Sequence, residues 1–170
     1  MFEVGDVIIY GRNGVCKVKK IDVLDNPNVD RKKLYYTLQP CYVKGNTIFT
    51  PVDNTKVIMR PVLTKKEVMQ MIEEIQDIET LWIDDEKKRE SAYKDAICKC
   101  DCRELVRIIK TIYTRKQTRL AEGKKVTNTD ERYFKLAEES LYGEFAMALE
   151  MSKEETKDYV VMQVERLIEK

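Results

Sequence analysis

The side chains best suited to chemistry are three closely spaced thiols, Cys98, Cys100 and Cys102, with Asp101 before the last of them. Thiolates bind zinc, and thiolates with a lowered pKa react with oxidants. A structural zinc site needs four ligands, usually in two spaced pairs, whereas the chain has no histidine and only two other cysteines. We therefore expect no metal and no cofactor, and interpret the cluster as a turn between helices with Asp101 as an N-cap. A thiol-based sensor stays open as an alternative.

The composition also bears on catalysis, because the chain contains no histidine. Histidine is the commonest general base, and neither a Ser–His nor a Cys–His nucleophilic pair can be built without it. We therefore expect that the protein is not an enzyme, and we assign no catalytic residues.

The only tryptophan, Trp82, lies between an apolar-periodic helical run and a second helix that begins with three acids at 84–86. A lone tryptophan at a helix junction is usually a core residue, since burial of its large apolar area is favourable. The polar surroundings on its C-terminal side leave a second interpretation open, in which the ring is a wedge against an unstacked base of distorted DNA. Basic residues that follow it, and that would hold the flanking phosphates, are Lys87, Lys88, Arg89 and Lys94.

The net charge of +1 hides an asymmetry along the chain. From Arg103 to Lys125 there are eight Lys or Arg against two acids, whereas residues 136–170 carry four bases and nine acids. Clustered cations contact phosphates with little sequence preference, although a solvated helix face has the same pattern. The candidate phosphate contacts in this run are Arg115, Lys116, Arg119, Lys124 and Lys125.

Length and composition indicate the class of protein. A chain of 170 residues allows one large domain or two small ones. The charged share of 36% indicates an extensive polar surface, and the hydrophobic share of 43% is enough for packed cores. No apolar run reaches the length of a membrane span, and the N-terminus lacks the pattern of a signal peptide. With an odd number of cysteines, this favours a cytoplasmic protein without membrane contact.

The first 60 residues alternate in a way typical of short strands. Strands are predicted at residues 7–10, 15–21, 34–38, 47–50 and 57–59, separated by polar turns. Asn13-Gly14 predicts a hairpin, because both residue types accept a positive φ. Five short strands favour a small Tudor-like or SH3-like β-barrel. Its strand at 47–51 ends in a proline, as edge strands do, and such an edge can accept a partner's strand.

After Pro61 the hydrophobic period changes from two to about 3.6, which predicts helices. Capping-box patterns begin at Thr64 and Ser152, and further caps are predicted at Asp101 and near Thr127. The expected architecture is α+β, with the barrel at 1–60 and an α-helical bundle of about five helices at 61–170.

Several segments resemble the CarD family of bacterial transcription regulators, of the CarD/CdnL type. These are residues 2–10 with Gly14 and Ile21, residues 47–52, Trp82 followed by a basic helix, and residues 136–146 with their Gly-Glu pair. The resemblance covers roughly residues 1–150. The last helix, from Ser152 onward, is an extension to which we assign no role, and its acidic character argues against DNA.

The resemblance implies a two-part mode of action without catalysis or cofactor. The N-terminal Tudor-like domain would bind the β subunit of RNA polymerase, as the related module of the transcription-repair coupling factor does. The helical domain would contact promoter DNA at the upstream fork of the bubble. There Trp82 would be a minor-groove wedge that favours the open complex, with Lys87, Lys88, Arg89 and Lys94 on the phosphates. The polymerase-binding residues would be Leu24, Thr47, Ile48, Phe49, Thr50 and Pro51.

The family pattern and this chain differ at two of those positions. Some members carry Arg where this chain has Leu24 and Phe49, which implies either a more apolar contact or a shifted one here. The resulting hypothesis is a monomeric regulator associated with the nucleoid through RNA polymerase. The alternative is a protein–protein adaptor without DNA contact, with Trp82 in the core.

Overall fold

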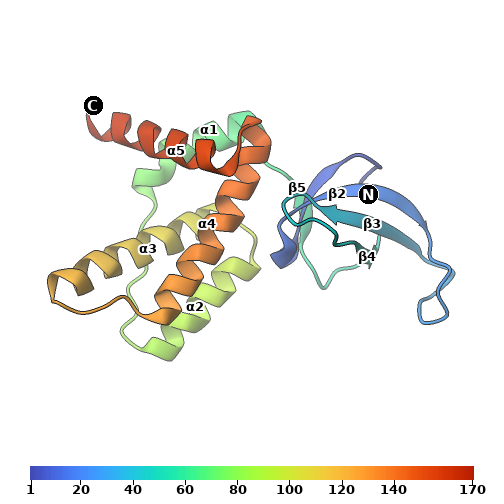
Figure 1. Ribbon diagram of the computed structural model, residues 1–170, viewed down its shortest axis with the longest axis horizontal. Helices are drawn as coiled ribbons and strands as arrows, with labels where there is room; N and C mark the ends of the chain where they lie inside the picture. Colours follow the sequence, from blue (N-terminus) through green and yellow to red (C-terminus); the bar gives the residue numbers. More distant parts are fainter. The chain divides into compact units, whose positions relative to one another are not determined.

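The structure, a computed structural model, describes all 170 residues. They divide into two compact units, Met1–Val62 (unit 1) and Leu63–Lys170 (unit 2). Unit 1 contains all the strands and unit 2 all the α-helices (Figure 1). None of the helices combines the length and the apolar character that crossing a lipid bilayer requires.

Unit 1 is one antiparallel sheet with the strand order β4-β3-β2-β1-β5. The predicted five strands and the α+β class are confirmed; the sheet is not closed, so it resembles a barrel only loosely. Its edge strands are short, and Pro51 and Pro61 at their ends have no N–H to donate to a further strand. The strands are β1 (Val7–Tyr10), β2 (Val15–Val23), β3 (Leu34–Pro40), β4 (Ile48–Pro51) and β5 (Met59–Pro61).

The β1–β2 hairpin forms as predicted, but its turn is not a two-residue Asn-Gly turn. Gly11–Asn13 make a 3-10 turn, and positive φ angles occur at Gly11 (+46°) and Gly14 (+69°), not at Asn13. A Cβ atom on Gly11 would lie 2.6 Å from Val57 Cγ1. Glycine is therefore required at this position for both conformation and space.

Alternate side chains of the strands build the core of unit 1 on one face of the sheet. Tyr36, 1% exposed, lies at its centre, and its hydroxyl accepts a hydrogen bond of 2.9 Å from the N–H of Phe2. Burial raises the pKa of the Cys16 thiol to about 12, so this cysteine is an inert core residue. The buried members are Ile8, Tyr10, Cys16, Val18, Tyr36 and Leu38.

Unit 2 has five α-helices, as predicted. The capping boxes at Thr64 and Ser152 both form, and Asp101 and Thr127 cap their helices with side-chain oxygens. The first helix is shorter than its apolar periodicity indicated, because a 3-10 turn (Ile75–Asp77) follows it. The helices are α1 (Lys65–Glu74), α2 (Glu86–Cys98), α3 (Cys102–Ala121), α4 (Asn128–Leu149) and α5 (Lys153–Ile168).

Helix α4 is the central element of unit 2, since it packs against the other four helices (Figure 1). Its apolar face meets α2 through Tyr133, whose ring centroid lies 5.7 Å from that of Tyr93. Phe145, which is fully buried, belongs to the same core, together with Ile72 of α1 and Val160 of α5. One continuous core therefore holds all five helices and fixes the segments between them.

Candidate nucleic-acid interface

Trp82 lies in an irregular stretch between the 3-10 turn and α2, which we call the Trp82 segment (residues 79–85). Its side chain is 73% exposed, so the interpretation of Trp82 as a core residue is wrong. The largest apolar side chain of the chain therefore stands in water, where it is available to a partner.

The N-terminal side of the Trp82 segment is anchored to α3. The N–H of Leu81 donates to Thr111 Oγ1 at 2.9 Å, and the Leu81 side chain packs against the core. Thr111 is buried, and its hydroxyl donates to the carbonyl of Arg107 at 2.7 Å. The hydroxyl thus accepts from one chain segment and donates to another, which fixes the position of the Leu81 peptide.

Arg89 anchors the C-terminal side of the same segment. Its guanidinium donates to the carbonyls of Ile83 at 3.0 Å and Asp84 at 3.3 Å, and the residue is only 8% exposed. The structure thus places Arg89 inside the unit, away from the solvent in which a phosphate would be met. Its spacing from Tyr93 and Ala96 puts it on the apolar face of α2, a pattern that the run of cations at 87–89 hid in the sequence.

Lys110 supports the turn that precedes the Trp82 segment. Its ammonium donates to the carbonyls of Ile75 at 2.8 Å, Gln76 at 3.1 Å and Ile78 at 2.6 Å. The carbonyls lie at the end of the 3-10 turn, where few backbone N–H groups are in position to donate to them. One lysine of the basic run is thus a cap for a neighbouring segment, which its sequence position did not indicate.

Three predicted cations of α2, Lys87, Lys88 and Lys94, lie exposed on the surface. Their contact with DNA stays a prediction. Acidic residues lie still closer to Trp82 in the chain: Asp84, Asp85 and Glu86 are exposed, and Asp85 is the N-cap that accepts from Lys88 N–H at 2.8 Å. The charge around the indole is therefore mixed.

We call the region where α3 ends and α4 begins the basic corner (residues 115–130). Arg115 Nε donates to Asp130 Oδ2 at 3.0 Å, and Arg119 Nε to the carbonyl of Lys125 at 2.8 Å. Lys124 forms an exposed ion pair with Glu122 at 3.0 Å. Among the five predicted phosphate contacts here, the three lysines, Lys116, Lys124 and Lys125, are exposed. Both arginines are half-buried and bond within the corner.

A buried polar network lies behind the basic corner. Tyr93 of α2 donates its hydroxyl to Asp130 Oδ1 at 3.1 Å, and Asp130 is 1% exposed. Burial, and then the Asp130 carboxylate, raise the pKa of Tyr93 above its ordinary value, so the phenol keeps its proton. In the sequence Asp130 looks like an ordinary acid in the first turn of a helix, and nothing there indicated a buried partner for two other helices.

The cysteine cluster does not gather its thiols at one point. Cys98 is exposed, whereas Cys100 and Cys102 are buried. Cys100 has a φ of +52° just after α2, and the Cys102 thiol lies 3.1 Å from Glu144 Oε2 in the core. No group of three or more Cys, Asp or Glu side chains is arranged to hold a metal ion.

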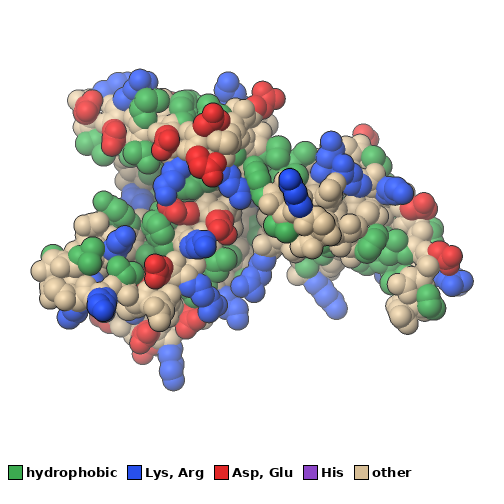
Figure 2. All heavy atoms as spheres, in the orientation of Figure 1, with side chains coloured by type: hydrophobic (Ala, Val, Ile, Leu, Met, Phe, Trp, Pro, Cys, Tyr) green, Lys and Arg blue, Asp and Glu red, His purple; other side chains and the backbone are tan.

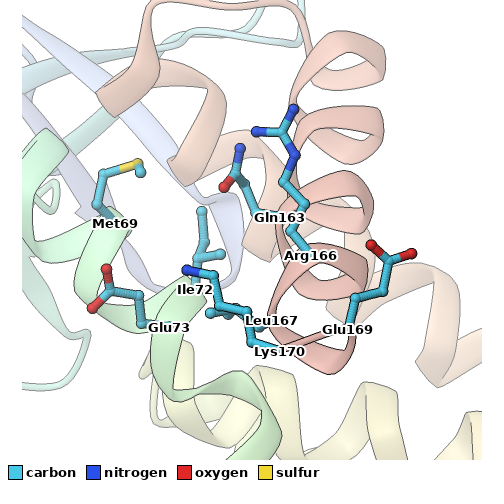
Figure 3. A pocket seen from close by; sticks show the side chains of 8 residues that line it. All are labelled: Met69, Ile72, Glu73, Gln163, Arg166, Leu167, Glu169 and Lys170. Atoms are coloured by element: carbon cyan, nitrogen blue, oxygen red, sulfur yellow. The ribbon is translucent and has the colours of Figure 1, made fainter.

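A groove of about 500 Å³ runs between α1 and α5 (Figure 3). Met69, Ile72 and Leu167 give it an apolar lining, and charged side chains such as Glu73 and Arg166 stand around it without converging on one point (Figure 3). It contains none of the residues predicted to bind DNA or polymerase.

The charge of the two units is opposite in sign. Residues 1–62 carry 10 Lys or Arg and 6 Asp or Glu, whereas residues 63–170 carry 21 and 24. On the face of unit 2 shown in Figure 2, basic and acidic side chains are interspersed. Unit 2 therefore lacks the broad positive field of a protein that binds DNA tightly by itself.

In unit 1 the predicted polymerase-binding strand is the sheet edge β4, which pairs only with β3. Phe49 points outward and is 54% exposed, whereas Thr50 is 1% exposed and accepts a hydrogen bond of 2.9 Å from Asn54. Ile48 is half-buried against the core, as Leu24 is half-buried just after β2. Thr47 is exposed and Pro51 half-buried. Of the six predicted contacts, Phe49 thus offers the largest apolar surface.

Residues 2–63 match the family model described as "CarD-like/TRCF RID domain". This range is essentially unit 1, and it includes the β4 edge. A comparison with curated proteins gives no match. The RID domain is a protein-interaction domain, and the match supports a transcription-related role through RNA polymerase. Unit 1 of this chain is therefore similar to the CarD-like/TRCF RID domain.

Proposed function

We propose that the protein is a non-enzymatic transcription regulator that binds the RNA polymerase β subunit through unit 1 and stabilises melted promoter DNA through unit 2. The observation that carries the proposal is the exposed Trp82, held on an anchored segment in a chain whose other unit is similar to the CarD-like/TRCF RID domain. Such a protein acts in the cytoplasm, on the nucleoid, as a monomer.

An indole in water is well suited to distorted DNA. Apolar side chains insert beside partly unstacked base steps, and unstacking costs less where the duplex is already open. Trp82 would stack at the upstream fork of the bubble, where one base pair is always adjacent to melted DNA. Its insertion would oppose reannealing and so lengthen the life of the open complex.

The mixed charge of unit 2 fits this mode of action. Exposed Lys87, Lys88 and Lys94 on α2 would contact phosphates beside the inserted ring, and Lys116 and Lys125 would add contacts from the basic corner. The acids at 84–86 weaken binding to ordinary duplex. A polymerase-bound unit 1 compensates, since tethering raises the local concentration of unit 2 at the promoter.

The polymerase surface in this proposal is the β4 edge. Its outer side has no strand partner, so a polymerase strand can add to the sheet, with Phe49 as the apolar contact. Phe49→Glu should weaken binding of the full chain to the polymerase β subunit at least tenfold. Val4→Glu is the matched control, because Val4 is 61% exposed in the same unit but outside β4.

The DNA role is tested by the lifetime of open promoter complexes after a competitor is added. Trp82→Ala should shorten the lifetime several-fold while polymerase binding stays unchanged. Tyr113→Ala is the matched control, since Tyr113 is an exposed aromatic residue (56%) of α3 and should leave the lifetime unaltered. Equal lifetimes for Trp82→Ala and the unmodified protein would favour the adaptor alternative, in which unit 2 docks on protein.

A further inference from the structure

The Trp82 segment lies outside the helices and strands, yet its backbone is bonded on both sides of the indole. Before Trp82, the Leu81 N–H is held by Thr111 of α3. After it, the Ile83 carbonyl is held by Arg89 of α2. The peptide groups one step removed from Trp82 on each side, 80–81 and 83–84, are thus held by two different helices.

Both anchoring side chains are themselves fixed. Thr111 is 3% exposed and also bonds to the Arg107 carbonyl in its own helix. Arg89 is buried one helical turn before Tyr93 on α2, and Tyr93 is bonded to the buried Asp130. The anchors are therefore part of the buried framework that joins α2, α3 and α4.

We infer that Arg89 and Thr111 are positioning residues that hold the indole of Trp82 outward before any partner arrives. This inference rests on the proposed function and extends it to how the wedge is presented. A buried guanidinium has its full desolvation cost unless its donors are used, so its bonds to Ile83 and Asp84 are retained in the free protein. With the backbone held on either side of it, Trp82 moves mainly by rotation of its own side chain.

Such preorganisation strengthens binding without a new contact. A mobile residue that must be ordered on binding weakens the complex by roughly fivefold or more. Loss of either anchor would make several residues of the segment mobile. It should therefore shorten the lifetime of the open complex, even though neither anchoring side chain contacts DNA.

The experiment uses the full chain with two variants, Arg89→Met and Thr111→Val. The first keeps the apolar stem and removes the donors, and the second keeps the shape and removes the hydroxyl. Because Trp82 is the only tryptophan, its time-resolved fluorescence anisotropy reports the mobility of this segment alone. We expect faster indole motion in both variants, at least tenfold faster amide exchange at Leu81 in Thr111→Val, and open-complex lifetimes reduced at least threefold.

Lys88→Met is the control for charge, since Lys88 is the exposed neighbour of Arg89 on α2. It should leave indole motion and Leu81 exchange unchanged. In a Trp82→Ala background, Arg89→Met should shorten the lifetime no further, because the positioned group is already absent. Circular dichroism checks that each variant is folded, and Thr111→Val decides the question if Arg89→Met does not fold.

Unchanged indole motion and unchanged Leu81 exchange in the folded variants would overturn the inference. So would a loss of DNA binding in Arg89→Met without any change in indole motion, because the guanidinium would then act on phosphate. If Trp82→Ala itself leaves the lifetime unaltered, the proposed function fails, whereas the anisotropy and exchange measurements still decide whether Arg89 and Thr111 position the segment.

Discussion

The Trp82 segment and the basic corner differ in the side chains that they expose at the surface of unit 2: an aromatic ring in the first and lysines in the second. In the first, an aromatic side chain is exposed while the cation beside it, Arg89, is buried under the segment. In the second, the arginines at 115 and 119 are occupied by Asp130 and the Lys125 carbonyl. Arg89 and Arg119 bond to backbone carbonyls and Arg115 to a carboxylate, so in both regions the arginines of a basic run are engaged within unit 2.

The two regions are connected by one buried polar network, although different side chains are exposed in each. Tyr93 lies on the same helix as Arg89 and bonds to Asp130, which in turn holds Arg115. A change in this network should therefore affect the basic corner more strongly than the Trp82 segment. This can be tested by replacing the buried residues of the network before the exposed ones.

The largest effect is expected from Asp130→Ala. Removal of this carboxylate leaves the Arg115 guanidinium and the Tyr93 hydroxyl without their partner in a low-dielectric interior. We expect the free energy of unfolding of unit 2 to fall by about 3 kcal/mol. Urea unfolding followed by circular dichroism measures this, and Lys116→Ala, an exposed neighbour of Arg115, should change it by less than about 0.5 kcal/mol. A similar loss in both variants would contradict a structural role for Asp130.

The next effect is a dependence on alkaline pH. Because the pKa of Tyr93 is raised in the folded protein, its contribution to stability is complete below the ordinary tyrosine value and is lost as pH rises through the folded value. Above about pH 10 this one group should lower stability by up to about 1.4 kcal/mol per pH unit. Tyr142, whose pKa burial raises to about 12, adds to the slope.

Tyr93→Phe separates the two tyrosines. It should flatten the alkaline dependence of the unfolding free energy while lowering stability at neutral pH by about 1 kcal/mol, the value of one hydrogen bond. An unchanged slope above pH 10 would show that Tyr93 ionises as easily in the folded chain as in the unfolded one.

A smaller change, of about tenfold in affinity, is expected when the exposed lysines near Trp82 are removed. Replacement of Lys87, Lys88 and Lys94 by Ala should weaken binding to forked DNA and lower the slope of log affinity against log salt by about one for each phosphate that is no longer neutralised. Lys65 and Lys66, exposed in the first turn of α1, are the matched sites to replace as a control. An equal loss from the control would indicate that general charge, not the surface beside Trp82, governs DNA affinity.

Much of the fold follows from local chemistry, and the sequence predicts that part well. The caps at Thr64 and Ser152 and the change of period after Pro61 are decided within a few residues, so the elements of unit 2 appear where expected. A sheet closes into a barrel only if its two edge strands pair with each other. The edge strands β4 and β5, which end in Pro51 and Pro61, do not pair, and the alternation of apolar residues does not predict this outcome.

The candidate site divides in the same way. Its residue types and order were visible in the sequence, since Trp82 and the lysines after it are neighbours along the chain. Which cations bond within unit 2 was not visible, because Arg89 is held by two backbone carbonyls and Arg115 by an acid on another helix. Exposure of a single side chain depends on the tertiary partners of its neighbours, which periodicity does not specify.

The smallest effect should come from the most conspicuous side chain. Trp82→Ala is expected to change the free energy of unfolding by less than about 0.5 kcal/mol, because a ring that is 73% exposed contributes little packing. Tyr133→Ala, at a position 2% exposed, should cost about 4 kcal/mol by comparison. Both values follow from urea unfolding by circular dichroism. A loss of several kcal/mol for Trp82→Ala would mean that the indole packs against unit 2 in solution. A shorter open-complex lifetime in this variant could then result from reduced stability of the protein. If the free energy of unfolding is nearly unchanged, a shorter lifetime instead indicates that the ring contacts DNA.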